Sequence, residues 1–344
     1  MNGIYLTISA CIAFFITWLL GKIFIPYLHK LNYGQTIREV GPTWHKNKQG
    51  TPTMGGIIFI IGIVVATTLT IFIYQIVGVD RGFVEVPLLI IKVISGLTMS
   101  LCFGMIGFVD DYIKVVKKRN LGLTSIQKLV LQFTIAFGYL ISLNLFENLH
   151  GSSVSTSIFI PMFGIIDFGI LYWPICVILI VGLVNAVNLT DGIDGLNSSV
   201  TFFNAIFLMI IAGILNMTGF GIFSAALAGG CLGFLLWNIH PAKVFMGDTG
   251  SLFLGGAICA LIFGMDIIGI LPIIGAIYMI EMFSIIAQVA YFKITKGKRI
   301  FKMTPIHHHF EMSGFNEYKI CGLFSMTTVF FGIITILIVK FWMI

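Results

Sequence analysis

The sequence predicts an all-α, polytopic membrane protein with about ten transmembrane helices, and three observations support this fold class. Of the 344 residues, 58% are hydrophobic and only 10% are charged, whereas soluble domains carry about 25% charged residues. The mean hydropathy of +1.03 leaves too little polar surface for a water-soluble globule. The apolar runs are continuous over about 20 residues, as in membrane-spanning helices, and do not alternate as barrel strands do. Soluble enzymes, disordered chains and secreted disulfide scaffolds are therefore excluded.

The individual spans are apolar runs long enough to cross the hydrocarbon core. They lie near residues 4–27, 55–78, 86–109, 126–146, 169–187, 197–216, 219–237, 250–265, 267–292 and 320–343. The first run lacks a basic leading segment and a clear small-residue cleavage site, so we interpret it as a retained span. The eighth run is short, and it meets the ninth at Gly264-Met265-Asp266. The ninth is long and contains Glu281, which predicts that it tilts or breaks.

The basic residues predict the orientation of these spans. The loops after the odd-numbered spans hold 16 of the 20 Lys and Arg residues, and the loops after the even-numbered spans hold Arg81 alone. Cytoplasmic loops carry such an excess of basic residues, so both termini are expected outside. The external loop 147–167 has no Lys or Arg and predicts a small hairpin. Because no repeat or linker divides the chain, we expect residues 1–344 to form one integral membrane domain.

Five acidic residues share one predicted position, where an apolar span meets the cytoplasm. They belong to three different loops and are Asp110, Asp111, Asp191, Asp194 and Asp248. Carboxylates at membrane depth are costly unless they face a polar cavity and find partners. If they converge, a hard divalent cation such as Mg²⁺ would relieve their repulsion. The alternatives for each motif taken alone are helix capping and simple Asp–Lys pairs.

Two further cytoplasmic segments carry polar side chains next to predicted spans. Residues 46–56 place Lys46 and Lys48 beside glycines, which suits a phosphate or pyrophosphate, although a basic loop is also an orientation signal. The second segment contains His307, His308 and His309 in succession. Consecutive histidines do not share one helix face, so a simple three-histidine metal site is not expected. One of them is expected to contact phosphate or donate a proton, and at least one to have a structural role.

Five segments together resemble the phospho-N-acetylmuramoyl-pentapeptide-transferase family, which belongs to the polyprenyl-phosphate N-acetylhexosamine-1-phosphate transferase superfamily. The resemblance covers essentially the whole chain. The segments are Gly50-Thr-Pro-Thr-Met-Gly-Gly56, Gly107-Phe-Val-Asp-Asp-Tyr112, Asn185-Ala-Val-Asn-Leu-Thr-Asp-Gly-Ile-Asp-Gly-Leu196, Phe245-Met-Gly-Asp-Thr-Gly-Ser251 and Pro305-Ile-His-His-His-Phe-Glu311. The last segment is similar to the muramoyl-pentapeptide enzymes in particular, because related GlcNAc-1-phosphate transferases differ there.

The resemblance implies an activity and a set of partners. The family transfers phospho-MurNAc-pentapeptide from UDP-MurNAc-pentapeptide to undecaprenyl phosphate, which gives lipid I and UMP in peptidoglycan synthesis. It requires Mg²⁺, and it is expected to form a homodimer in the bacterial inner membrane with its site on the cytoplasmic face. The alternatives from the sequence are a sister enzyme that uses UDP-GlcNAc and, from another class, a cation-coupled transporter. A transporter predicts ionisable groups near the membrane midplane, where only Lys92 and Glu281 are candidates.

The resemblance also implies roles for individual residues. It assigns catalysis to Asp110, Asp111, Asp248 and His307, and Mg²⁺ binding to Asp248, which we expect to share the ion with Asp111. Substrate binding falls to Lys48, Lys128, Asn188, Asp191, Asp194, Asn238, Phe245, His308 and His309. For the chemistry, two routes stay open. The acceptor phosphate attacks directly, with Asp110 as a base, or Asp248 or Asp110 first forms a covalent phosphosugar intermediate.

Overall fold

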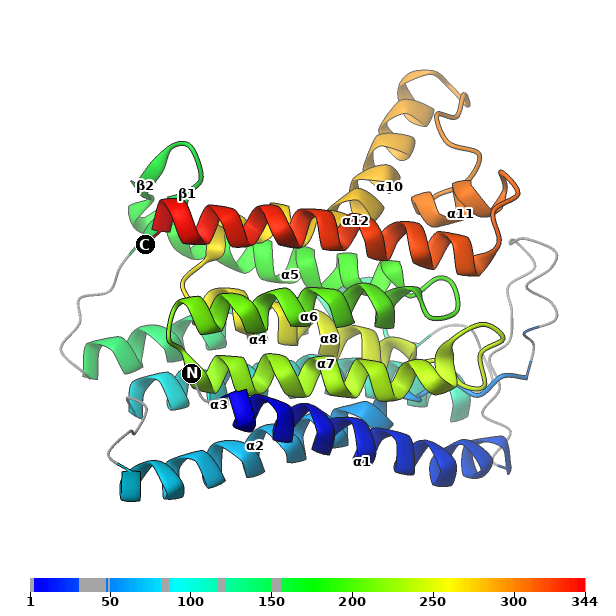
Figure 1. The fold of residues 1–344 in the computed structure, drawn as a ribbon. Helices are drawn as coiled ribbons and strands as arrows, with labels where there is room; N and C mark the ends of the chain where they lie inside the picture. Colours follow the sequence, from blue (N-terminus) through cyan, green and yellow to red (C-terminus); the bar gives the residue numbers. More distant parts are fainter. Residues whose placement is uncertain are drawn as a thin grey trace.

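The computed structural model is a bundle of long helices whose axes run in roughly the same direction (Figure 1). It describes residues 3–30, 48, 50–81, 87–116, 122–149 and 156–343. Within these residues, ten helices are long and apolar enough to cross a membrane, as the sequence predicts. The predicted bounds of most spans differ from the observed ones by only a few residues, because hydropathy marks the apolar core of a helix and not its polar ends.

The elements follow the chain in the order that the hydropathy pattern predicts. The long helices are α1 (Gly3–Lys30), α2 (Gly56–Arg81), α3 (Pro87–Val116), α4 (Ser125–Leu149), α5 (Tyr172–Thr190), α6 (Leu196–Ile214), α7 (Thr218–Asn238), α8 (Gly247–Gly264), α10 (Ala276–Ile294) and α12 (Glu317–Ile338). The shorter elements are β1 (Ser157–Ile160), β2 (Gly164–Asp167), η2 (Gly169–Leu171), η3 (Ile268–Ile270), α9 (Leu271–Ile274), α11 (Ile306–Glu311) and η4 (Val339–Met343).

Helices α7 and α8 form the buried centre of the bundle. Small residues let α3 approach α8 closely, as is usual between membrane helices, where backbone proximity replaces a hydrophobic driving force. A side chain at Gly107 would overlap the backbone of Asp248, and one at Gly256 would lie 2.9 Å from Ser100 Cα. This close approach brings one end of α3, which we predict to be cytoplasmic, against the first turn of α8.

The ninth predicted span is broken, as its length and Glu281 predict. The short helix α9, with Pro272 in its first turn, ends at Gly275, and α10 begins directly after that glycine. Beyond this break α10 leaves the bundle at an angle (Figure 1), and most of its side chains are not buried. The predicted hairpin is also confirmed, since β1 and β2 pair antiparallel with Ser157 opposite Asp167 and Ile160 opposite Gly164.

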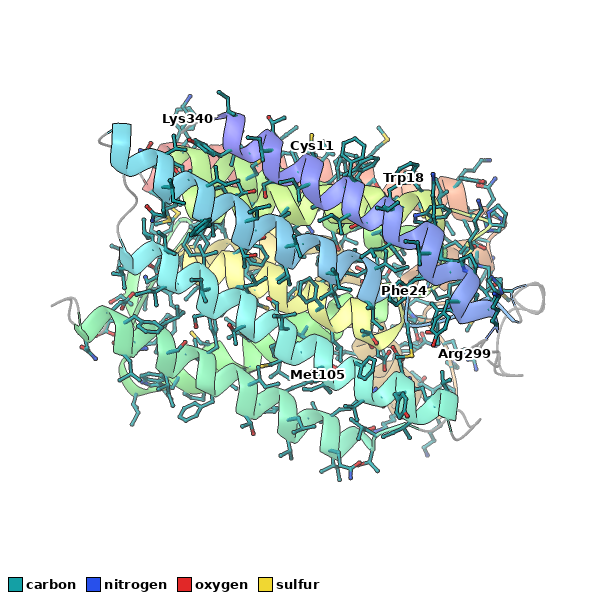
Figure 2. All side chains as sticks on the ribbon, turned by 90° about the horizontal axis from the view of Figure 1, so that it is seen from below. Cys11, Trp18, Phe24, Met105, Arg299 and Lys340 are labelled. Atoms are coloured by element: carbon teal, nitrogen blue, oxygen red, sulfur yellow. The ribbon has the colours of Figure 1, made fainter. Side chains whose placement is uncertain are left out.

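The outer surface of the bundle is apolar, which suits contact with lipid. Met105 on α3 is 61% exposed, and Figure 2 shows it on the outside of the bundle. In the same view Lys340 lies at one end of the molecule and Arg299 at the other. Helix α1 begins and α12 ends at the Lys340 end, opposite the loop between α10 and α11 (Figure 1). The assignment of the Lys340 end to the outside of the cell stays a prediction.

Candidate active site

Three carboxylates from two helices meet at the end of the bundle opposite the chain termini. Asp110 and Asp111 lie on α3, and Asp248 lies in the first turn of α8. One carboxylate oxygen from each lies within 4.8 Å of the others. The sequence placed the two acids at the end of the third span, but α3 continues to Val116. The extra turn is stabilised by Lys114, whose Nζ lies 2.6 Å from Asp110 Oδ2 one turn earlier.

Two lysines neutralise part of this negative charge. Lys128 Nζ, from α4, lies 2.9 Å from Asp110 Oδ2 and 2.7 Å from Asp248 Oδ2. Lys114 Nζ lies 3.1 Å from the same Asp248 oxygen. Asp110 and Asp111 are buried and Asp248 is partly buried, so each charge needs such partners. When all three carboxylates are ionised, the two ammonium groups leave one excess negative charge, which favours a further cation at this position.

Asp111 also caps helix α8 from a neighbouring helix. Its Oδ2 accepts hydrogen bonds from the backbone N–H of Thr249 at 2.9 Å and from Thr249 Oγ1 at 2.7 Å. The N–H of Asp248 points to the other oxygen at 3.3 Å. These groups are among the donors that a helix N-terminus leaves unpaired. The capping interpretation of this motif is therefore partly right, but the cap comes from Asp111 and not from Asp248.

Asn188 connects the end of α5 to this cluster. Its Nδ2 donates to Asp248 Oδ1 at 3.0 Å and to Ser251 Oγ at 2.7 Å. The backbone then turns through Asp191 and reaches Gly195, which has a φ of +77° and precedes α6. The N-cap position of α6 is Gly195, which has no side chain, so neither an Asp nor an Asn of this segment occupies it. The glycine is required because L side chains rarely adopt that backbone conformation.

Asp191 lies in this turn with an altered acidity. Loss of hydration raises the pKa of Asp191 well above its usual range, and the charges of Asp248, Asp111 and Asp194 raise it further. The five predicted acids therefore do gather at one end of the molecule. Strongly perturbed carboxyl groups of this kind are concentrated at functional sites, and a cation bound nearby would favour the ionised form.

Lys48 is the centre of a second charged cluster beside the same turn. Its Nζ lies 2.7 Å from Asp194 Oδ1 and 2.7 Å from a carboxylate oxygen of Glu317. The other oxygen of Asp194 lies 2.9 Å from His240 Nδ1. Glu317 also accepts the backbone N–H of Asp194 at 2.8 Å. The cluster ties the α5–α6 turn to the start of α12.

The remaining predicted substrate residues hold neighbouring segments together. Asn238 Oδ1 accepts the N–H of Gly195 at 3.1 Å, and its Nδ2 donates to the Val244 carbonyl at 3.0 Å. The backbone of Phe245 donates to Pro52 O at 2.9 Å and accepts from Gly55 N at 2.9 Å. Three of the sequence motifs are thus adjacent in space. Lys46, Asn47 and Gln49, which precede the Gly50–Gly56 segment, lie outside the described residues.

The three histidines have different environments. His307 is fully buried, and its Nδ1 lies 3.0 Å from both oxygens of Glu281. His308 Nδ1 lies 2.5 Å from Glu311 Oε2, and His309 Nδ1 accepts the N–H of Lys302 at 3.2 Å. The contact between His309 and the loop backbone is consistent with the expected structural role for at least one histidine, which stays a prediction.

Sequence reasoning missed several residues that the structure places at the site. They are Lys114, His240, Thr249, Glu281 and Glu317. Two of them could have been predicted from their positions in the sequence. Lys114 lies one helical turn after Asp110, and Glu317 is an acid at the start of an apolar span. The others find their partners only through helix–helix packing, which the linear sequence does not display.

The fold and the site define a polytopic membrane enzyme with an acidic, lysine-balanced centre. The family described as Glycosyl transferase family 4 matches residues 93–266, and signature 1 of phospho-N-acetylmuramoyl-pentapeptide-transferase matches residues 48–60. Proteins of that name from Halalkalibacterium halodurans and Clostridioides difficile are 44% and 45% identical to the chain. The alignments cover 96% of both chains for the first and 97% and 98% for the second. The chain therefore belongs to the phospho-N-acetylmuramoyl-pentapeptide-transferase family.

Proposed function

We propose that the protein transfers phospho-MurNAc-pentapeptide from UDP-MurNAc-pentapeptide to undecaprenyl phosphate, which gives lipid I and UMP in peptidoglycan synthesis. Membership of the family supports this activity. The observation that carries it is the meeting of Asp110, Asp111 and Asp248 at one end of a membrane-spanning bundle. A soluble anionic donor and a lipid phosphate can react only at such a boundary.

The location follows from the same argument. The lipid acceptor is confined to a leaflet, and the nucleotide donor is cytosolic. The site would therefore open to the cytoplasm from the bacterial inner membrane, at the end that carries Arg299 (Figure 2). The excess of basic residues in the corresponding loops supports this orientation. The homodimer that the family resemblance implies stays a prediction.

The residues present fit a magnesium ion. Carboxylate oxygens are the ligands that Mg²⁺ takes in proteins, usually from one or two side chains together with water and substrate phosphates. Asp248 and Asp111 would hold the ion, and the excess negative charge of the cluster supports this assignment. When bound, it would neutralise charge that develops on the pyrophosphate oxygens of the donor.

The lysines of the site would provide the rest of the charge neutralisation. Lys114 and Lys128 face the carboxylate cluster, and Lys48 faces the α5–α6 turn. Attack of one phosphate on another is opposed by anion–anion repulsion, so positioning and fixed positive charge are the main contributions that a protein can make. These lysines are already held in place by carboxylates, so little reorganisation is needed when an anionic substrate arrives.

The net bond change is the same in both candidate routes, and the covalent route adds a carboxylate–phosphorus bond that forms and then breaks. A new bond forms to the sugar-linked phosphorus, and the bond from that phosphorus to the bridging oxygen breaks, so UMP leaves. In direct attack, an oxygen of the acceptor phosphate forms the new bond. In the covalent route, a carboxylate of Asp248 or Asp110 forms it first, and the acceptor then displaces the carboxylate.

The surroundings of Asp110 favour a role in holding charge over a role as a base. Its Oδ1 accepts the N–H of Leu123 at 2.7 Å, and its Oδ2 faces Lys114 and Lys128. A general base needs a free oxygen within reach of the proton that it removes. Asp110 would gain one only if a lysine moved to the substrate.

The other predicted residues would line the donor site. Those in the substrate-binding set are Lys48, Lys128, Asn188, Asp191, Asp194, Asn238, Phe245, His308 and His309. The clustering of the first seven around the α5–α6 turn and the carboxylates supports this assignment. For His308 and His309 the support is their place on α11, next to the buried His307.

One assay tests the function and its two rivals. Purified protein is incubated with Mg²⁺, undecaprenyl phosphate and either UDP-MurNAc-pentapeptide or UDP-GlcNAc, and the release of UMP is measured. We expect release with the muramoyl donor only. Release with UDP-GlcNAc alone would identify a sister transferase, and no release with either donor would contradict a transferase. The transporter alternative has lost its main support, because Glu281 pairs with His307 and Lys92 pairs with Glu147 and Asp266.

A single-turnover experiment separates the two routes. Protein is mixed with labelled UDP-MurNAc-pentapeptide without the lipid acceptor and is analysed for a phosphosugar attached to the chain. Direct attack predicts no adduct and no stoichiometric UMP. An adduct that disappears when undecaprenyl phosphate is added would establish the covalent route.

A further inference from the structure

A buried carboxylate–histidine pair lies next to the site without belonging to the charged clusters. Glu281 on α10 and His307 on α11 are both fully buried, and both carboxylate oxygens lie 3.0 Å from His307 Nδ1. An ionised carboxylate only accepts hydrogen bonds, so Nδ1 carries the hydrogen. The pair therefore fixes both the orientation of the imidazole and which of its nitrogens is protonated.

The second nitrogen of this histidine faces the predicted substrate site. His307 Nε2 is buried and has no hydrogen-bond partner among the residues that the structure describes. It lies against Gly192, where an added Cβ would overlap the nitrogen. Gly192 follows Asp191 in the turn between α5 and α6. A buried polar atom without a partner is unusual in a folded protein, and here it points at the turn that carries two predicted substrate residues.

The pair forms where α10 meets α11, after the break in the ninth span. Helix α10 begins at Ala276 and leaves the bundle at an angle, and α11 lies beside it (Figure 1). Glu281 lies on α10 after this break, and its carboxylate reaches His307, the first histidine of α11.

We propose that Glu281 is a positioning residue for His307, and this rests on the proposed function. Its carboxylate holds the Nδ1–H and so presents Nε2 to the Asp191–Gly192 turn, where a phosphate or hydroxyl of the substrate would meet it. Gly192 leaves room for the imidazole ring itself, and the carboxylate fixes the orientation of that ring. His307 touches the substrate, whereas Glu281 acts through His307.

The first test is a set of single variants measured by UMP release. Glu281→Gln keeps the shape of the side chain, but its amide can either donate or accept a hydrogen bond. The variant therefore no longer determines which nitrogen of the imidazole carries the hydrogen. We expect kcat to fall roughly 10- to 100-fold, by analogy with other residues that orient a functional histidine. KM for the nucleotide substrate should change by less than about twofold, because the substrate-binding groups stay in place.

Glu147→Gln is the matched control. It makes the same substitution in another ion pair, in which Glu147 is partly buried and its partner Lys92 is buried, on a helix end far from the candidate site. It should leave kcat unchanged. A loss of kcat in this control equal to that of Glu281→Gln would mean that any lost ion pair lowers activity, and would overturn the proposal.

Coupling between variants distinguishes positioning from general stability. In a His307→Ala background, Glu281→Gln should cause no further loss of kcat, because the group that it positions is gone. Gly192→Ala displaces the same ring without touching Glu281 and should lower kcat in a similar way. If Glu281→Gln lowers kcat by the same factor with and without His307, the carboxylate acts independently of the histidine and the proposal is wrong.

A measurement on the unmodified protein keeps the proposal testable if the variants fold poorly. Nitrogen-15 NMR of histidine-labelled protein reports which ring nitrogen carries hydrogen, with His307→Gln used to assign the signal. We expect hydrogen on Nδ1 of His307 at neutral pH, and the opposite form would overturn the proposal. Wild-type protein that releases no UMP would instead refute the proposed function, while the NMR result would stand by itself.

Discussion

Lys128 offers the sharpest perturbation of the carboxylate cluster. Its Nζ bridges Asp110 and Asp248, at 2.9 Å and 2.7 Å. Lys128→Met removes the ammonium group and keeps an unbranched chain of similar length. The two carboxylates would then share Lys114 alone, which contacts both of them. We expect a less stable protein, because a negative charge at membrane depth would lose a partner.

The size of the effect follows from the contacts. Removing one partner of a buried ion pair destabilises a protein by about 3–5 kcal/mol. The side chain of Lys128 is 25% exposed, and Lys114 still contacts the same oxygens, so we expect about 2–3 kcal/mol instead. For a chain of this size, this loss corresponds to a fall of roughly 5 °C in the unfolding midpoint.

Thermal unfolding in detergent, followed by tryptophan fluorescence at a fixed heating rate, measures this fall. The control is Lys340→Met, which removes an exposed lysine at the other end of the bundle (Figure 2); its midpoint should stay close to that of the wild type. Adding Asp110→Asn to Lys128→Met should recover part of the lost stability, since it removes one unpaired charge. An unchanged midpoint in Lys128→Met, or a double variant less stable than the single one, would refute this account of the cluster.

Three further predictions concern the same region. Gly107→Ala forces a side chain into the backbone of Asp248, so it should lower the free energy of unfolding by about 3 kcal/mol or more and abolish most of the UMP release. Gly138→Ala, which has nothing within 4 Å of the added Cβ, should change neither stability nor UMP release. Equal losses of stability in the two variants would contradict the packing argument. Burial and nearby charges raise the pKa of Asp191, so the folded state keeps its proton to a higher pH than the unfolded state, and stability falls as pH rises above the ordinary value. Asp191→Asn should therefore unfold at a higher temperature than the wild type at pH 8 but not at pH 4, and a midpoint gain that is equal at both would contradict this. Lys48→Met should raise KM for UDP-MurNAc-pentapeptide at least about tenfold, and an unchanged KM would remove the residue from the donor site.

The sequence predicted the architecture well because membrane spans depend on a simple physical requirement. An apolar run of sufficient length must become a helix in lipid, since its backbone groups have no other partners there. The broken ninth span was predicted from its length and from Glu281, and the structure places the break at Gly275, ahead of that acid. The hairpin at Ser157–Asp167 was predicted from an external loop that lacks Lys and Arg and is rich in Ser, Thr and Ile.

The candidate site was predictable only in part. The motifs with Asp110, Asp191 and Asp248 all precede or follow spans on one predicted side, so their proximity could be expected. Their partners could not, because partner choice depends on how each helix is rotated. Helices α7 and α8 are buried on nearly all sides, so their sequences show no apolar stripe from which a rotation could be inferred. The capping of α8 by Asp111 and the pairing of Lys48 with Glu317 belong to this category.

The central claim is that carboxylates from α3 and α8 hold a divalent cation at one end of the bundle. Binding of Mn²⁺, which accepts the same oxygen ligands as Mg²⁺, can be measured by electron paramagnetic resonance on the purified protein. We expect one bound ion per chain, lost in Asp248→Asn and weakened in Asp111→Asn, and retained in Asp266→Asn at the opposite end of the bundle. Binding that survives both of the first two substitutions, or that is lost equally in the third, would contradict the claim.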